Sequence, residues 1–204
     1  MSQIRTDAII CALKAHGENG GVVRLLTPDS GLLAGYVQGA RGRENRPVLI
    51  PGNRVVADLR ARGGSQLASL SCELVGSVGP WLGEPLAALG IDWITTLTAI
   101  ALPEGHPYPR LYDALGGVLG AIVAAPAARA WVVPLLRYEQ LLLAELGYGL
   151  VQSDMGSASG AWDSVLAALH ESGSQLDRHI LIDWRATIRP VRARLIARLT
   201  KAAG

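Results

Sequence analysis

Apolar residues in the first eighty positions fall into five short runs, each about as long as a β-strand and each ending in turn-forming residues. Pro28-Asp29-Ser30-Gly31 is the clearest connection, because Pro presets one turn dihedral, Asp or Ser can hydrogen-bond the backbone, and Gly accepts a positive φ. Five strands in so short a segment predict a small barrel. The expected strands are Thr6–Leu13, Val22–Thr27, Leu32–Gln38, Asn53–Leu59 and Gln66–Val75.

The spacing of apolar positions changes after Gly79-Pro80-Trp81, where longer segments rich in Ala and Leu begin. Leu135, Leu142 and Leu146 share one helical stripe, and Gly147 stands where a helix C-terminal glycine is expected. We therefore predict an α+β chain of two domains, a five-stranded barrel over residues 1–80 and an all-α helical domain over residues 81–204. The expected helices are Leu86–Leu102, Arg110–Ala124, Ala127–Leu146, Ala161–His170 and Arg185–Thr200, with Ser172–Ser174 as an interruption.

A Gly-rich turn after the third expected strand carries Arg41, Arg43 and Arg46. Arginines spaced two to three residues apart cannot all enter a core, so we expect them to project into water as a site for a polyanion. The alternative is a solvated loop that only keeps the barrel soluble. Almost every cation of the chain is Arg, which favours bidentate phosphate contacts, although a GC-rich genome produces the same bias.

The distribution of charge is more informative than its sum. A formal net charge of +2 is too small for a histone-like polycation. Nine basic and five acidic residues lie in the first 62 positions, so the predicted barrel is basic. A second basic cluster closes the chain and consists of Arg185, Arg189, Arg192, Arg194, Arg198 and Lys201.

Residues suited to catalysis or metal binding are sparse. Cys11 and Cys72 are too few for a zinc cluster or a disulfide framework, and the four histidines show no metal-ligand spacing. His179 with Asp183 permits a remote hydrolase interpretation, but no activated nucleophile accompanies them. We expect a non-enzymatic, cytoplasmic protein without metal or cofactor. We also expect no membrane span, because the apolar stretch 114–128 is too short and contains a proline.

Nucleic-acid binding is better supported than catalysis. A small barrel with a basic turn at one edge is typical of proteins that hold single-stranded nucleic acid in an electrostatic groove. Tyr36 is the only Phe, Tyr or Trp in the first eighty residues, so bases have little to stack on. Affinity should come from phosphate neutralisation and be indifferent to sequence. For three to five contacts, it should fall with salt with a log–log slope of roughly −2 to −4.

The first part of the chain contains, in order, the segments Asp7-Ala8-Ile9-Ile10, Gly17-Glu18, Val23 to Gly31 and Gly39-Ala40-Arg41. The later part contains Pro109 to Leu115 and the run from Leu136-Arg137-Tyr138-Glu139 through Gly149. In order and spacing these segments resemble the opening and the helical signature of the RecO family of bacterial recombination mediators, and the likeness extends over about residues 6 to 150.

The resemblance implies an N-terminal OB-fold that binds single-stranded and double-stranded DNA, followed by a helical domain. It implies a role in DNA repair and DNA recombination: annealing complementary strands and helping to load recombinase onto strands coated by single-stranded DNA-binding protein. The implied partners are DNA, the C-terminal tail of that protein and a RecR-type mediator. Many members carry four zinc-binding cysteines, but residues 149–160 contain none here, so zinc should be absent.

The resemblance also assigns a nucleic-acid site. The basic turn of the family falls on Arg41, Arg43 and Arg46. Arg24, on the neighbouring strand, is expected to share their face.

A partner site is implied as well. The arginine that opens the signature helix falls on Arg137, which in similar proteins lies near the groove that receives an acidic, Phe-terminated tail. A guanidinium suits a terminal carboxylate, and Leu136 and Leu141 are expected to accept the ring. The alternative for Arg137 is an ion pair with Glu139 or across the helical bundle, although a spacing of two does not place residues 137 and 139 face to face. The alternative function is a non-catalytic protein-interaction scaffold with incidental nucleic-acid affinity.

Overall fold

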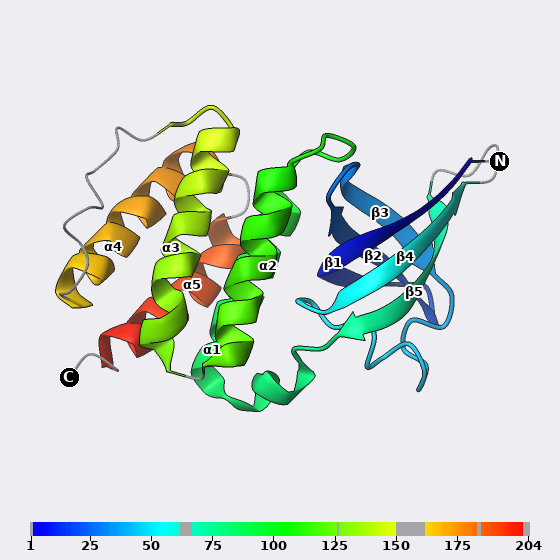
Figure 1. Ribbon diagram of the computed structural model, residues 1–204, viewed down its shortest axis with the longest axis horizontal. Coiled ribbons are helices and arrows are strands. Elements are labelled where there is room, and N and C mark those ends of the chain that lie inside the picture. Colours follow the sequence, from blue (N-terminus) through cyan, green and yellow to red (C-terminus); the bar gives the residue numbers. More distant parts are fainter. Residues whose placement is uncertain (1, 62–66, 126, 150–161, 183–184, 202–204) are drawn as a thin grey trace. The chain divides into compact units, whose positions relative to one another are not determined.

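The computed structural model describes residues 2–61, 67–125, 127–149, 162–182 and 185–201. Contacts divide the chain into two compact units, one of residues 1–83 and 95–113 and the other of residues 84–94 and 114–204. Figure 1 shows the strands of the N-terminal part curled into a barrel and the later segments coiled into helices. The strands end at Gly76 and the first α-helix begins at Pro85, yet residues 95–113 belong to the unit that contains the barrel.

Five strands close the barrel in the order β1-β2-β3-β5-β4, which confirms the predicted five-stranded architecture. Neighbouring strands run antiparallel except for β3 and β5, whose short parallel pairing joins Gly35 to Ala68 and Tyr36 to Ser69. The strands are β1 (Ser2–His16), β2 (Gly20–Thr27), β3 (Gly31–Val37), β4 (Arg54–Ala61) and β5 (Ala68–Gly76).

β1 is longer than the sequence pattern indicated because it serves two neighbours. Its first half pairs with β4, from Ser2 opposite Ala61 to Ile9 opposite Arg54. Its second half pairs with β2, and a register shift after Ile10 lets the strand bend from one partner to the other. Polar residues at the start of β1 hid this extension, because strand prediction relied on apolar runs.

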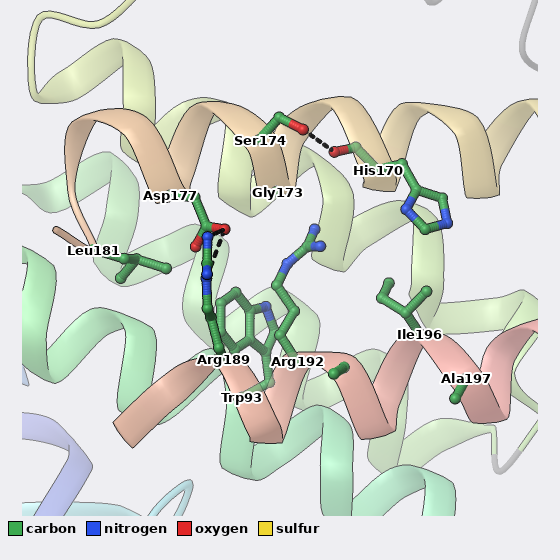
Figure 2. Close-up of a pocket in the computed structure, with 11 residues that line it drawn as sticks. Trp93, His170, Gly173, Ser174, Asp177, Leu181, Arg189, Arg192, Ile196 and Ala197 are labelled. Carbon is green, nitrogen blue, oxygen red and sulfur yellow. Dashed lines mark hydrogen bonds and ion pairs between the residues drawn. The ribbon is translucent and has the colours of Figure 1, made fainter. Parts of the chain in front are cut away.

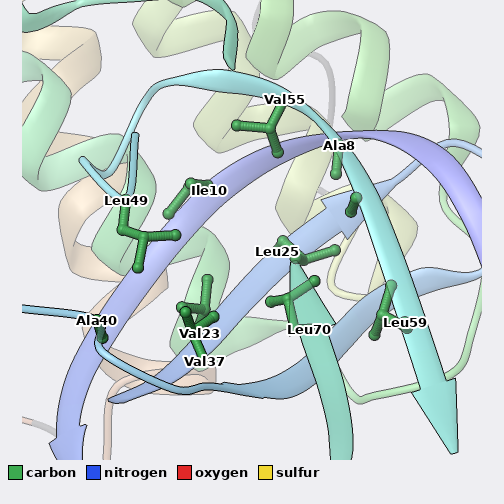
Figure 3. Close-up of a cluster of buried hydrophobic side chains, with 11 residues drawn as sticks. Ala8, Ile10, Val23, Leu25, Val37, Ala40, Leu49, Val55, Leu59 and Leu70 are labelled. Atoms are coloured by element: carbon green, nitrogen blue, oxygen red, sulfur yellow. The ribbon is translucent and has the colours of Figure 1, made fainter. Parts of the chain in front are cut away.

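The interior of the barrel is filled by aliphatic side chains from all five strands, such as Ile10, Leu25 and Leu70 (Figure 3). Two further members of this core, Ala40 and Leu49, come from the turn region between β3 and β4. Both are 2% exposed. The polypeptide that carries the basic turn is therefore fixed to the core at two points.

Residues 103–106 extend the barrel unit along the edge of β3. Leu32 forms a parallel bridge with Glu104, and the amide of Gly105 donates to the Leu32 carbonyl at 2.9 Å. Gly31 adopts φ 70°, as its place at the end of the predicted turn requires, and a Cβ there would lie 1.8 Å from the His106 carbonyl oxygen. Only glycine fits this close approach.

In the described part of the chain, five α-helices follow the strands, and a short 3₁₀ turn at Gly79–Gly83 precedes them. α3 ends as predicted at Gly147, which has φ 84°, and the amide of Tyr148 donates to the Leu143 carbonyl at 2.8 Å. The helices are α1 (Pro85–Ala101), α2 (Pro109–Ala124), α3 (Ala128–Glu145), α4 (Trp162–His179) and α5 (Arg185–Lys201).

The prediction that Ser172–Ser174 interrupts the fourth helix was wrong, because α4 continues through it to His179. Ser172 is buried and its hydroxyl donates to the Glu139 carboxylate at 2.6 Å. Gly173 faces Arg192 so closely that a Cβ would lie 2.1 Å from a guanidinium nitrogen. Packing between helices requires the polar Ser172 and the small Gly173 at this point. These tertiary contacts override the low helix propensity of both residues.

Glu139 is the centre of a buried polar cluster in the helical unit. Its carboxylate is 0% exposed and accepts hydrogen bonds from Trp93 Nε1 at 2.7 Å and from Ser172. Arg192 donates to it at 3.1 Å, and its guanidinium also lies over the Trp93 ring at 5.4 Å. A buried carboxylate with donors from three other helices, α1, α4 and α5, fixes how the four helices pack.

Arg192→Met should lower the free energy of unfolding by about 3 kcal/mol, because it leaves a buried carboxylate without its counter-charge. Adding Glu139→Gln should recover most of the loss, since a neutral amide can still accept from Trp93 and donate to Ser172. Urea unfolding followed by tryptophan fluorescence measures both. Arg198→Met, an exposed substitution on the same helix, is the control and should change stability by less than about 0.5 kcal/mol.

Gly31→Ala should destabilise the barrel unit by about 2 kcal/mol more than Gly105→Ala does. Both residues have positive φ, 70° and 74°, so both substitutions pay the same backbone cost, but only position 31 also meets a carbonyl oxygen. Thermal unfolding of the two variants measures the difference. Equal melting temperatures would show that the 103–106 segment is not held against β3.

Candidate nucleic-acid interface

The turn between β3 and β4 is built by hydrogen bonds within its own backbone. Gly39 has φ 65° and accepts from the amide of Gly42 at 2.8 Å, and the Gly42 carbonyl accepts from the amide of Arg46 at 2.9 Å. The Asn45 carbonyl accepts from the amides of Val48 and Leu49 at 3.0 and 2.9 Å. These bonds give the turn a defined path before any side chain contributes.

Asn45 fastens the first half of the turn. Its side-chain amide donates to the carbonyl of Gly39 at 3.1 Å and to that of Gln38 at 3.3 Å. The residue lies between Arg43 and Arg46 in the sequence, so one polar side chain holds the segment that presents both arginines. Sequence reasoning missed this role, although an asparagine within a glycine-rich turn is the signal that suggests it.

Asn53 fastens the second half. This side chain is fully buried, donates to the carbonyls of Pro47 and Val48 at 2.9 Å each, and accepts from the amide of Val78 at 3.0 Å. All three of these side-chain bonds reach backbone groups, so the side chain ties Pro47 and Val48 to Val78. The sequence pattern marked Asn53 only as the first residue of a strand, because its partners at positions 47, 48 and 78 become neighbours only in the folded chain.

Arg41, Arg43 and Arg46 are all exposed on this fixed turn. Among the described residues, none of their guanidinium groups forms a hydrogen bond or an ion pair with the protein. Together with Pro47 and Ile50 they line a surface hollow of about 640 Å³. The structure therefore brings the three predicted residues together, with their donors facing solvent.

Arg24 does not join them. Its guanidinium donates to the carbonyl of Ala99 and to the Glu104 carboxylate, the latter at 3.1 Å. The expectation that Arg24 shares the face of the basic turn followed from its position on a neighbouring strand. The structure instead engages this side chain with residues 95–113 of the same unit, where it stabilises the fold.

The ring of Tyr36 is not available for base stacking beside the turn. Its hydroxyl donates to Gln38 at 3.1 Å, its ring meets His16 edge-on at a centroid distance of 6.0 Å, and a Cβ at Gly20 would lie 2.1 Å from its hydroxyl. The ring thus packs against the backbone of β2. Phosphate contacts, rather than base stacking, are what this surface can supply.

Arg137 and Leu141 lie on the outer side of α3, one helical turn apart. Arg137 is exposed and has no ion pair or hydrogen bond among the described residues, so no pair with Glu139 forms. Leu141 is partly exposed, as are Val133 and Pro134 on the preceding turn of the same side. Leu136, the third residue of the predicted partner site, is 0% exposed and packs in the helical core, so it cannot contact a partner there.

A pocket of about 490 Å³ lies between α4 and α5, over Trp93 (Figure 2). Arg189 and Asp177 close one side of it with an ion pair of 2.7 Å. Ser174 donates to the backbone carbonyl of His170 at 3.1 Å, not to its imidazole. The lining therefore contains no hydroxyl activated by a base, and its arginines already have carboxylate partners.

Other candidate chemistry is also absent from the described residues. Burial raises the pKa of the Cys11 thiol to about 12 and that of the Cys72 thiol to about 11, so both are protonated at neutral pH. No group of three His, Cys, Asp or Glu side chains could hold a metal ion in the described part of the chain. His179 stacks on Tyr148 at 4.7 Å, and its proposed partner Asp183 lies outside the described residues, as do positions 150–160 of the cysteine-free segment.

Within the ranges that the structure describes, no helix combines the length and the apolar character needed to cross a bilayer.

Comparison with known proteins gives matches over both units. The family model "Recombination protein O N terminal" matches residues 1–78, and "Recombination protein O C terminal" matches residues 83–160. DNA repair protein RecO of Phenylobacterium zucineum is 36% identical over 178 residues, covering 86% of this chain and 71% of that protein. DNA repair protein RecO of Paracoccus denitrificans is 32% identical over 189 residues, covering 93% of this chain and 76% of that protein.

A third relative, DNA repair protein RecO of a Caulobacter strain, is 34% identical over 174 residues, or 84% of this chain and 70% of that protein. Matches at this level over most of both chains establish descent rather than a shared fold alone. The barrel is an OB-fold, and the chain belongs to the RecO family of DNA repair and recombination proteins, which act as mediators without catalysing a reaction.

Proposed function

We propose that this protein binds single-stranded and double-stranded DNA through the turn that carries Arg41, Arg43 and Arg46. In this role it anneals complementary strands and helps to load recombinase onto strands coated by single-stranded DNA-binding protein. The observation that supports the proposal is the state of these three side chains, which are exposed, without carboxylate partners among the described residues, and displayed on a turn fixed by Asn45 and Asn53. A RecR-type mediator is a further partner expected of a member of this family.

Preorganisation matters for this proposal because a phosphodiester chain gains most from cations that are already in place. A flexible loop would lose conformational entropy on binding, at a cost of about 1–2 kcal/mol for each backbone residue that becomes ordered. Here Ala40 and Leu49 are buried and the backbone is tied by asparagine side chains, so only the arginine side chains remain to be ordered. Three phosphate contacts correspond to a log–log salt slope of about −2 on a single strand.

Arg41→Glu combined with Arg43→Glu should abolish strand binding at moderate salt while the fold stays intact. Two attractive contacts become repulsive, and neither side chain contributes a bond to the barrel. Fluorescence anisotropy of a labelled single strand across a salt series measures the loss, and circular dichroism verifies folding. Arg178→Glu, an exposed substitution on α4, is the control and should bind normally. Unchanged affinity of the double variant at low salt would exclude the turn as the DNA site.

We further propose that the outer side of α3 receives the acidic, Phe-terminated tail of single-stranded DNA-binding protein. Arg137 would hold the terminal carboxylate, and Leu141 with Pro134 would contact the ring. Exposure of a guanidinium beside partly exposed apolar residues supports this site and equally favours the alternative, an interaction scaffold for which nucleic acid is incidental. Leu136 has no place in the revised site because it is buried.

Arg137→Glu should weaken binding of such a tail peptide at least tenfold, because a charge-assisted hydrogen bond contributes about 1.5–3 kcal/mol. Isothermal titration with an acidic peptide ending in Phe measures the change, and Arg178→Glu again serves as control. The Arg41→Glu, Arg43→Glu variant should bind the peptide as the natural protein does. If this double variant retains both peptide binding and recombinase loading, DNA binding by the turn is not needed for function, and the protein acts as an interaction scaffold.

A further inference from the structure

Cations of the helical unit fall into two groups according to whether a carboxylate faces them. On α5, Arg189 pairs with Asp177 at 2.7 Å and Arg192 with Glu139 at 3.1 Å. Arg194, Arg198 and Lys201 are exposed, and among the described residues none of them has an acidic partner. Within the described ranges, the only side-chain hydrogen bond of the three is donated by Arg194 to the carbonyl of Pro190 on its own helix, at 3.3 Å.

The three cations lie along one side of α5. Positions 194, 198 and 201 are separated by four and three residues, which places successive side chains about 6 and 4.5 Å apart along the helix axis. Leu195 and Leu199 face the core, and Ile196 and Ala197 face the pocket beside Trp93, on the other flank of the helix. The cationic stripe is therefore separate from that pocket and from the ion pairs that hold α5 to α4.

Nothing in the helix offsets this charge. The segment from Arg185 to Lys201 contains six basic residues and no Asp or Glu. Lys201 and Arg198 lie in the last turn, where a helix dipole favours cations, but that effect fades within one turn and does not extend to Arg194. Stability of the helix thus accounts for two of the exposed cations at most, and the stripe as a whole is left as an unneutralised surface for a polyanion.

We propose that Arg194, Arg198 and Lys201 form a second contact site for the phosphodiester backbone of nucleic acid, distinct from the arginine turn of the barrel. The inference rests on the proposed DNA-binding function and extends it to the helical unit. A row of point cations at roughly phosphate spacing, with partly exposed Val191 as the apolar neighbour, suits a sequence-independent backbone contact. The two sites belong to different compact units, so a single chain carries two separate surfaces for nucleic acid.

The salt dependence of binding tests this site in the intact 204-residue chain. A single-stranded oligothymidylate of about 50 nucleotides exceeds the roughly 4–16 that one OB-fold covers, so both surfaces can engage it. Arg194→Gln with Arg198→Gln should reduce the magnitude of the log–log salt slope by about 1.4, since each lost phosphate contact removes about 0.7. Arg198→Gln alone should remove about half of that amount. Arg178→Gln, an exposed cation outside the stripe, should leave the slope unchanged.

An unchanged slope in the Arg194, Arg198 double variant, with native circular dichroism, overturns the second site, whether or not the turn binds DNA. If Arg41→Gln with Arg43→Gln leaves the salt slope unchanged, the β3–β4 turn is not a DNA site. The site on α5 is then tested independently by the Arg194, Arg198 double variant. If the double variant loses affinity for the acidic tail peptide instead of for DNA, the stripe attracts that peptide, and the assignment to phosphodiester is wrong.

Discussion

Whether an arginine faces a carboxylate of the protein decides whether it holds the fold together or stays available to an external anion. A guanidinium that already faces a buried or well-placed carboxylate is neutralised, and a phosphate can recruit it only by breaking that pair. Arg24, Arg189 and Arg192 are in this state, bound to Glu104, Asp177 and Glu139. They join segments of the fold, and each of their charges already faces a carboxylate of the protein. The arginines of the β3–β4 turn are in the opposite state, because no acidic side chain in the described part of the chain reaches them.

A fixed backbone lets the unpaired arginines of the turn attract an anion without the entropy cost of ordering a loop. Exposed cations on a mobile loop attract anions weakly, since ordering the loop consumes much of the gain. Here uncharged residues hold the turn in place. The side chains of Asn45 and Asn53 hydrogen-bond its backbone, and Ala40 and Leu49 pack in the barrel core. Polar groups that point inward satisfy backbone carbonyls, while charged groups that point outward stay hydrated. The same segment therefore contributes to stability and, in the proposed role, to binding through different side chains.

Much of the fold follows from local sequence, and most of the errors arise where distant residues meet. Strand positions, the Gly31 turn and the Gly147 helix end were predictable because each depends on residues within a few positions. Extension of α4 through Gly173 was not, because it depends on Arg192 and Glu139 from other helices. Local spacing alone cannot reveal such partners.

The site residues show the same division. Arg41, Arg43 and Arg46 could be identified from composition, since a cluster of arginines has no place in a core. Arg24 could not be separated from them without knowing that Glu104 lies beside it, 80 residues later in the sequence. Leu136 and Leu141 look alike in the sequence, yet helical geometry buries one and leaves the other partly exposed.

The shortage of exposed aromatic rings in the barrel sets what kind of DNA binding this architecture can support. Without stacking, each proposed contact is an ion pair with a phosphate, individually weak and exchanged readily at physiological salt. Weak, sequence-independent contacts at the two proposed sites suit the proposed annealing role, in which strands of any sequence are held and the paired product is then released. Tight base-stacking grooves would favour single strands over duplex and oppose that release, so the scarcity of aromatic residues in the barrel is consistent with the proposed annealing role.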